Sequence, residues 1–320
     1  MVLAIQAGAL FALSLALALP VTRALSRAWW PRRAPRAALV LWQAIGMAGG
    51  LSLLTAGVTL TAVGTGAHWR HAVRTAWRAW PQLGFWGWVG LVFTVCMAAW
   101  LVIVAVTSTA RVVRARRGHR ERLAMIARAG RLTEVRDRDV LLVEHPVAAA
   151  YCLPGIRPQV VVTRGALTTL TAKELGAVLA HERAHARGHH HLVTQPFIAW
   201  ARTFPFLPHA REGLEAVDVL VEMLADQLAL RECEPQHLAD ALRRLNGTAP
   251  DASTTSDSGT TSDSGTTSKN GTAADLQLRT GVRLARLEGG TQPLARAAVA
   301  AVYLAAGLLV LGPPVALVLS

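Results

Sequence analysis

Long apolar runs are the strongest pattern along the chain. Four segments contain no charged side chain: 2–20, 37–63, 84–107 and 297–319. Each is close to the ~20 apolar residues that an α-helix needs to cross the hydrocarbon core of a bilayer. The pattern therefore predicts four transmembrane helices, three before a long polar segment and one after it.

Two short apolar segments lie in the polar region between the third and fourth runs. Residues 140–143 and 159–163 are rich in β-branched side chains and are flanked by turn formers, which predicts two strands. We expect the second of them, 159–163, to be an exposed edge on which an extended peptide could pair.

Two helices are predicted after these strands. Thr171 and Glu174 have the spacing of a capping box, which opens a helix that runs to His185 or slightly beyond. A second helix is expected to start near Glu212, and Pro205 and Pro208 separate the two helices. Its apolar residues recur at helical spacing, and they are Val217, Val221, Leu224 and Leu228.

The segment 247–274 has a different composition. It repeats Thr-Thr-Ser-Asp-Ser-Gly and offers no large apolar side chain to a core, so we expect a disordered insert. The predicted domain organisation is then a membrane part, a polar domain, this insert, a basic juxtamembrane helix and a last span. Their ranges are 1–107, 108–246, 247–274, 275–296 and 297–320.

Composition supports a membrane protein. Of the 320 residues, 52% are hydrophobic and 17% are charged, whereas soluble domains carry about 25% charged residues. Three cysteines, an odd and small number, exclude a disulfide scaffold. The net charge of +13 comes almost wholly from arginine.

The arginines also predict the orientation in the cell membrane. Basic residues gather after the first run, between Arg23 and Arg36, and after the third run, from Arg111 to Arg138. Because such loops stay in the cytoplasm, we expect a cytoplasmic polar domain and both termini outside. Contact with anionic lipid explains the basic segments better than nucleic-acid binding, for which no motif is present.

The sequence His181-Glu182-Arg183-Ala184-His185 is an HExxH motif on the capped helix. Residues i and i+4 share one helix face, so His181 and His185 could bind one Zn²⁺. Glu182, one step around the helix, would be the general base that deprotonates water. The alternative is a solvated, polar helix end without a metal.

The third metal ligand has two candidates. His191 completes the HExxHxxGxxH pattern of metzincins, and Glu222 is a carboxylate on the second helix, as in gluzincins. We favour Glu222, because the nearby Met223 lies within a helical pattern and cannot form the Met-turn of a metzincin. Asp226 shares the face of Glu222 at i+4 and would hydrogen-bond a ligand histidine. His189, His190 and His191 are then expected to form a surface cluster.

Four stretches of the chain are similar to actinobacterial members of the BlaR/MecR-type antirepressor zinc metallopeptidases. These stretches are Ala150-Tyr-Cys-Leu-Pro-Gly, Val160-Val-Val-Thr-Arg-Gly-Ala-Leu167, Val178-Leu-Ala-His-Glu-Arg-Ala-His185 and Val221-Glu-Met-Leu-Ala-Asp226. HtpX-like and CAAX-type membrane proteases share the same motifs.

The resemblance implies a mainly α membrane protein with a cytoplasmic α+β gluzincin-type zinc peptidase domain between transmembrane helices three and four. It also implies zinc ligands His181, His185 and Glu222, the base Glu182, and Asp226 as their hydrogen-bonding support. The related proteases add a later arginine that stabilises the transition state, for which Arg283 is a candidate. A basic juxtamembrane helix before the fourth span is the favoured explanation of Arg283. The chain ends without the penicillin-binding domain of the antibiotic sensors, so no β-lactam receptor role is expected.

Three functions follow as hypotheses. The first is an endopeptidase in regulated proteolysis, whose protein substrate could be a winged-helix transcriptional repressor. The second is a quality-control protease acting on membrane proteins. The third is a zinc-stabilised signalling scaffold without catalysis, which the intact Glu182 disfavours because a structural site has no use for a base.

Overall fold

The structure is a computed structural model that describes residues 2–65, 83–128, 132–134, 140–153, 159–204, 208–247, 273–290 and 292–319. The segment 64–83 between the second and third apolar runs and the repeat insert 247–274 fall, for the most part, outside the described residues. The described chain is mainly helical and divides into two compact units.

The first unit contains the apolar helices. They are α1 (Val2–Ala16), α2 (Thr22–Arg27), α3 (Pro35–Thr65), the first part of α5 (Phe85–Arg128) and α12 (Arg296–Leu319). In the described part of the chain, four helical segments are long and apolar enough to cross a membrane: Val2–Arg27, Pro35–Val63, Phe85–Arg111 and Arg296–Val318. They match the four predicted runs, and they support a multi-pass membrane protein.

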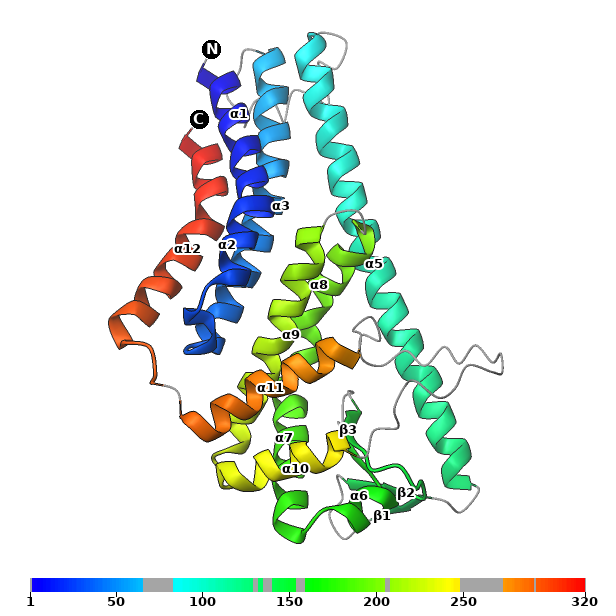
Figure 1. Ribbon diagram of the computed structural model, residues 1–320. Helices are drawn as coiled ribbons and strands as arrows, with labels where there is room; N and C mark the ends of the chain where they lie inside the picture. Colours follow the sequence, from blue (N-terminus) through cyan, green and yellow to red (C-terminus); the bar gives the residue numbers. More distant parts are fainter. Residues whose placement is uncertain are drawn as a thin grey trace. The chain divides into compact units, whose positions relative to one another are not determined.

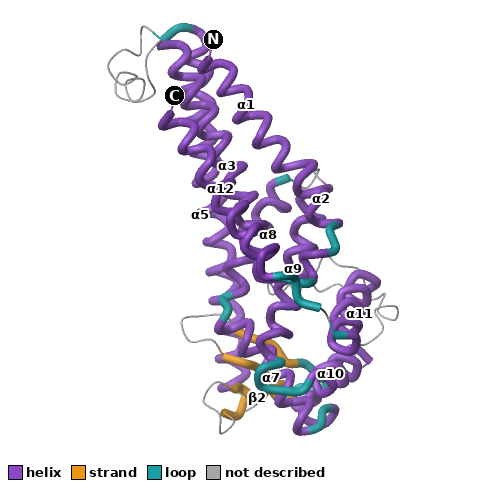
Figure 2. The backbone as a smooth tube through the Cα atoms, turned by 90° about the vertical axis from the view of Figure 1, so that its left-hand side faces the viewer, coloured by secondary structure: helices purple, strands orange, loops and turns teal. Residues whose placement is uncertain are grey.

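Helix α3 is the centre of this unit, because both α1 and α12 pack against it. Helix α1 begins and α12 ends at the same end of these helices (Figures 1 and 2). The first span is one continuous helical segment with a short π-helical stretch, Leu17–Val21, around Pro20. Proline has no N–H to donate, so the regular α-helical hydrogen bonds are interrupted there.

The second unit contains a four-stranded sheet among the described residues. Its strands are β1 (Leu132–Glu134), β2 (Val140–Val143), β3 (Ala150–Leu153) and β4 (Gln159–Thr163), in the order β1-β2-β4-β3. Strands β2 and β4 are parallel, whereas β1 and β3 each pair antiparallel with their neighbour. Both predicted strands are confirmed at their expected bounds.

The position predicted for the substrate edge is wrong, however. Strand β4 lies in the interior of the sheet, hydrogen-bonded to β2 on one side and to β3 on the other. The edge is β3, which the sequence did not mark as a strand because its four residues show neither a β-branched run nor alternation. A peptide could therefore extend this side of the sheet only next to β3.

Among the described residues, six helices lie between the sheet and α12 along the chain. They are α6 (Arg164–Thr169), α7 (Ala172–Arg187), α8 (His190–Thr203), α9 (Pro208–Ala229), α10 (Pro235–Gly247) and α11 (Ala273–Gly289). The second predicted helix, expected to start near Glu212, is α9, which begins slightly earlier at Pro208, and α8 lies between it and α7 without having been predicted. Proline suits the first helical turn, where its missing N–H would have no partner.

Helix α7 is the core helix of the second unit, and it contacts β3, β4 and α10 (Figure 2). Val178 faces a buried cluster with Val160 and Val162 of the sheet, and Ala177 and Ala180 pack with Leu238 of α10. The predicted capping box is present: Thr171 Oγ1 accepts from the Glu174 N–H, and Glu174 Oε2 accepts from the Thr171 N–H. The cap and the apolar contacts hold α7 rigidly beside β3.

Candidate metal centre

Two imidazoles on one face of α7 form the base of the site. His181 and His185 are one helical turn apart, and their Nε2 atoms lie 3.1 Å from each other. His181 is buried and His185 is half-buried. The predicted i, i+4 pair is therefore brought together with both Nε2 atoms turned toward the same point.

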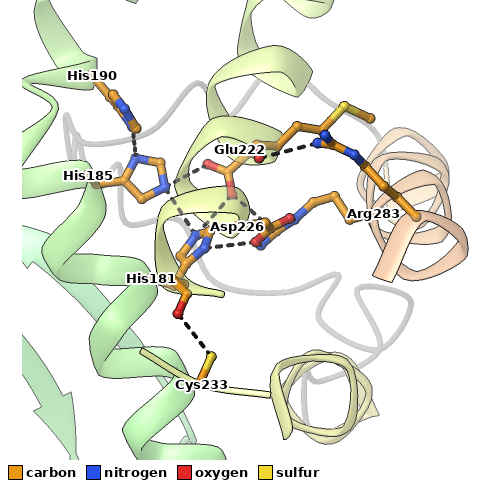
Figure 3. Close-up of polar contacts among 10 residues, drawn as sticks. His181, His185, His190, Glu222, Asp226, Cys233 and Arg283 are labelled. Carbon is orange, nitrogen blue, oxygen red and sulfur yellow. Dashed lines mark hydrogen bonds and ion pairs between the residues drawn. The ribbon is translucent and has the colours of Figure 1, made fainter. Parts of the chain in front are cut away.

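Glu222 of α9 completes this arrangement (Figure 3). Its Oε2 lies 3.3 Å from His181 Nε2, and its Oε1 lies 3.3 Å from His185 Nε2. Among the described residues, these three side chains form a cluster with ligand atoms within 4.8 Å of one another. His191, the alternative third ligand, does not belong to this cluster.

The three side chains fit zinc in chemistry and in spacing. Two imidazole nitrogens and a carboxylate are a common catalytic donor set for this ion. Ligand atoms ~2.0–2.1 Å from a tetrahedral ion would be about 3.3 Å apart. The two Nε2 atoms are 3.1 Å apart, and each lies 3.3 Å from one of the two Glu222 oxygens. A divalent ion could thus be bound with little rearrangement.

Asp226 lies behind His181, as its position one turn after Glu222 predicts. Its Oδ1 is 2.9 Å from His181 Nδ1, and the side chain is 5% exposed. Burial alone would raise the pKa of Asp226, but the contacts with His181 and Arg283 lower it below the ordinary value. Asp226 is thus held as a carboxylate that fixes the His181 ring with Nε2 toward Glu222.

Arg283 of α11 reaches the candidate site, so its side chain is more than part of a basic juxtamembrane helix. Its Nε and Nη2 donate to the two Asp226 oxygens at 2.8 and 2.7 Å, and its Nη1 lies 2.9 Å from Glu222 Oε2. The side chain is 11% exposed. One guanidinium thus joins the Asp226 and Glu222 carboxylates, and its fork on Asp226 is a bidentate geometry that lysine could not reproduce.

The charges of the site explain its pKa shifts in the metal-free protein. Burial alone would lower the pKa of His181, but Asp226 and Glu222 outweigh this effect and raise it to about 10. Burial would raise the pKa of Glu222, and hydrogen bonds from both histidines, with Arg283 nearby, lower it well below the ordinary value instead. The site therefore stabilises positive charge at the point where the three ligand atoms meet.

Glu182 follows His181 on α7 and lies beside the edge strand. Burial raises its pKa above that of an ordinary glutamate, although His181, His185 and a hydrogen bond from the Cys152 backbone oppose the shift. A carboxylate whose proton affinity is raised in this way is suited to accept a proton and to return it. The helix thus places a candidate base next to the predicted ligands.

His190 was missed as part of the site, and its predicted place in a surface cluster is wrong. The residue is 3% exposed, and its Nδ1 lies 3.0 Å from His185 Nδ1. His189 is exposed and His191 half-buried. Because α7 ends at Arg187 and α8 begins at His190, the three consecutive histidines take different directions.

Comparison with known families agrees with a site that could bind a metal ion. Residues 113–225 match the model of Peptidase family M48, a stretch that includes His181, His185 and Glu222. No curated protein and no solved structure gave a significant match. The M48 match indicates a metallopeptidase, and the four apolar helices indicate one associated with a membrane.

Proposed function

We propose that this protein is an integral membrane zinc endopeptidase that hydrolyses peptide bonds on the cytoplasmic side of the cell membrane. The main support is the convergence of His181, His185 and Glu222, with distances that suit a tetrahedral ion. These three residues would bind the metal, and Glu182 would be the general base. When bound, zinc supplies a Lewis acid for a carbonyl oxygen and for water.

The residues around the proposed ligands have two further roles, which are proton transfer and positioning of the ligands. Glu182 accepts the proton of the attacking water and donates it to the amine that leaves. Asp226 orients His181, and Arg283 holds Asp226 and Glu222 in place. The preformed arrangement avoids the cost of ordering these groups at the moment of reaction.

The free edge of β3 supports an extended peptide as the substrate. The Thr163 N–H donates to the Ala149 oxygen, and hydrogen-bonded pairs alternate along antiparallel strands. The alternation turns the backbone groups of Ala150 and Cys152 away from β4. A peptide paired with the backbone of Ala150 and with the Cys152 carbonyl oxygen would run past Glu182, which accepts a hydrogen bond from the Cys152 N–H.

Regulated proteolysis is the biological role that we propose, with a winged-helix transcriptional repressor as the substrate class. It rests on the resemblance of the four motif stretches to the antirepressor peptidases. A protease of this kind would cleave one partner at one site. Cleavage of many unrelated membrane proteins by the purified enzyme would instead favour quality control.

Metal analysis of the purified full chain tests the proposed function. Wild-type protein and His191→Ala should each contain one zinc per chain, and Glu222→Ala should lose most of it because one of three ligands is absent. Zinc loss in His191→Ala with retention in Glu222→Ala would identify the other ligand set. A wild-type chain without zinc would contradict the proposal as a whole.

A further inference from the structure

The buried His190 contacts the side of His185 that faces away from the candidate metal ligands (Figure 3). The two Nδ1 atoms are 3.0 Å apart, and the rings meet edge-on, with centroids 4.8 Å apart and an interplanar angle of 83°. His185 thus has Glu222 at its Nε2 and His190 at its Nδ1. His181 is placed in the same way, with Glu222 at its Nε2 and Asp226 at its Nδ1.

The backbone after α7 is shaped to bring His190 into this position. His189 has a φ of 45°, in the left-handed region that few non-glycine residues adopt. At Gly188, a Cβ atom would lie 2.3 Å from His190 Nε2, so only glycine leaves room for the imidazole. The turn at Gly188 and His189 therefore directs His190 back toward α7.

Only one of the two facing Nδ1 atoms can carry a proton in a hydrogen bond between neutral imidazoles. A metal at His185 Nε2 needs the lone pair of that atom, which leaves the proton of His185 on its Nδ1. His185 Nδ1–H then donates to His190 Nδ1, and His190 carries its own proton on Nε2.

We propose that His190 is a positioning residue that accepts the Nδ1–H of His185 and fixes this ring for metal binding. The inference rests on the proposed function and deepens it, because it assigns a second supporting residue to the same site. His190 Nε2 is buried without a hydrogen-bond partner among the described residues. An apolar side chain would avoid that cost, so packing alone does not explain a histidine here.

Zinc affinity of the full chain in detergent, measured by competition with a chromogenic chelator, tests the proposal. His190→Phe fills the space but accepts no hydrogen bond, and it should weaken zinc binding about 10–100-fold. His190→Asn places an amide oxygen near the position of Nδ1, and it should retain most of the affinity. His191→Phe is the matched control and should bind zinc like the wild type.

The metal-free unfolding temperature separates positioning from packing, because His190→Phe should leave it unchanged or raise it. If the Phe variant does not fold, His190→Leu is compared with His190→Asn in the same assay. Equal zinc affinity in the apolar and Asn variants would overturn the inference, whether both were weak or both were normal. If wild-type protein bound no zinc, the proposed function itself would fail, which is a distinct result.

Discussion

Arg283 balances two carboxylates that would otherwise be costly to bury. Asp226 is 5% exposed and Glu222 is 35% exposed, and both contact this guanidinium. Buried ion pairs add little net stability, but removal of one partner leaves an uncompensated charge. Arg283 is therefore important for the integrity of the site even before any reaction takes place.

Replacement of Arg283 by Met should destabilise the metal-free protein by about 3 kcal/mol, since Asp226 would remain buried without its counter-charge. Arg283→Lys should fall between this variant and the wild type, because an ammonium cannot bind both oxygens in the same fork. Thermal unfolding monitored by circular dichroism measures both. The control is Arg187→Met, which removes a guanidinium 68% exposed from its pair with Glu232. Equal effects of the Met variants at positions 283 and 187 would argue against a buried charge network.

Glu182→Gln isolates the chemical role of the base. Glutamine keeps the size of the side chain but cannot accept a proton, so cleavage should fall by about 10²–10⁴ while zinc is retained. The measurement is cleavage of a fluorogenic peptide selected from a library by the wild-type enzyme, together with elemental analysis. Glu234→Gln, at a side chain that is 74% exposed, should remain fully active. Undiminished cleavage by Glu182→Gln would remove Glu182 from its proposed role.

Single site residues could be predicted from the sequence where helical spacing places them on the same face as a partner. The i, i+4 spacing placed His181 beside His185, and it placed Asp226 on the face of Glu222. His190 could not be found in this way, because its direction depends on the left-handed turn at His189. The available signal was a glycine, Gly188, followed by three histidines shortly after the helical HExxH motif.

Strand order is a feature of whole elements that the sequence alone did not predict, as the position of β3 in the sheet shows. The bounds of β2 and β4 followed from their β-branched residues, but composition does not determine which strands become neighbours. The parallel pairing of β2 with β4 leaves β3 on the outside. Helix α9 began earlier than predicted, because a proline that separates two helices can also start the second.

Proline substitutions along β3 test the edge that we propose for the substrate. Ala150→Pro removes an N–H that points away from β4, so the fold should persist. Loss of about one hydrogen bond to the peptide should reduce kcat/KM about tenfold, with unchanged zinc content. Tyr151→Pro removes an N–H on the side of β4, and it should lower the unfolding temperature instead. Full activity of Ala150→Pro would show that the substrate does not pair with β3.

Across the whole molecule, the number of spans and the distribution of arginine determine the topology. The four candidate spans among the described residues predict that both termini lie on the same side of the membrane. This expectation agrees with α1 beginning and α12 ending at one end of their helices (Figure 1). The apolar runs were long enough to be found in the sequence alone. Which side the polar domain occupies rests on the basic loops and stays a prediction.

Cysteine labelling in intact cells checks this topology. Cys96, Cys152 and Cys233 are first replaced by Ala, and one cysteine is then introduced at Val2, Ser26 or Glu234. The Val2 position should react with a membrane-impermeant maleimide, since it precedes the first span. Ser26, among the arginines after that span, and Glu234, in the polar domain, should react only after lysis. A permeant maleimide should label both of them in intact cells, which controls for accessibility. Labelling of Glu234→Cys from outside would place the peptidase domain on the opposite side, and a cytoplasmic repressor could then not be the substrate.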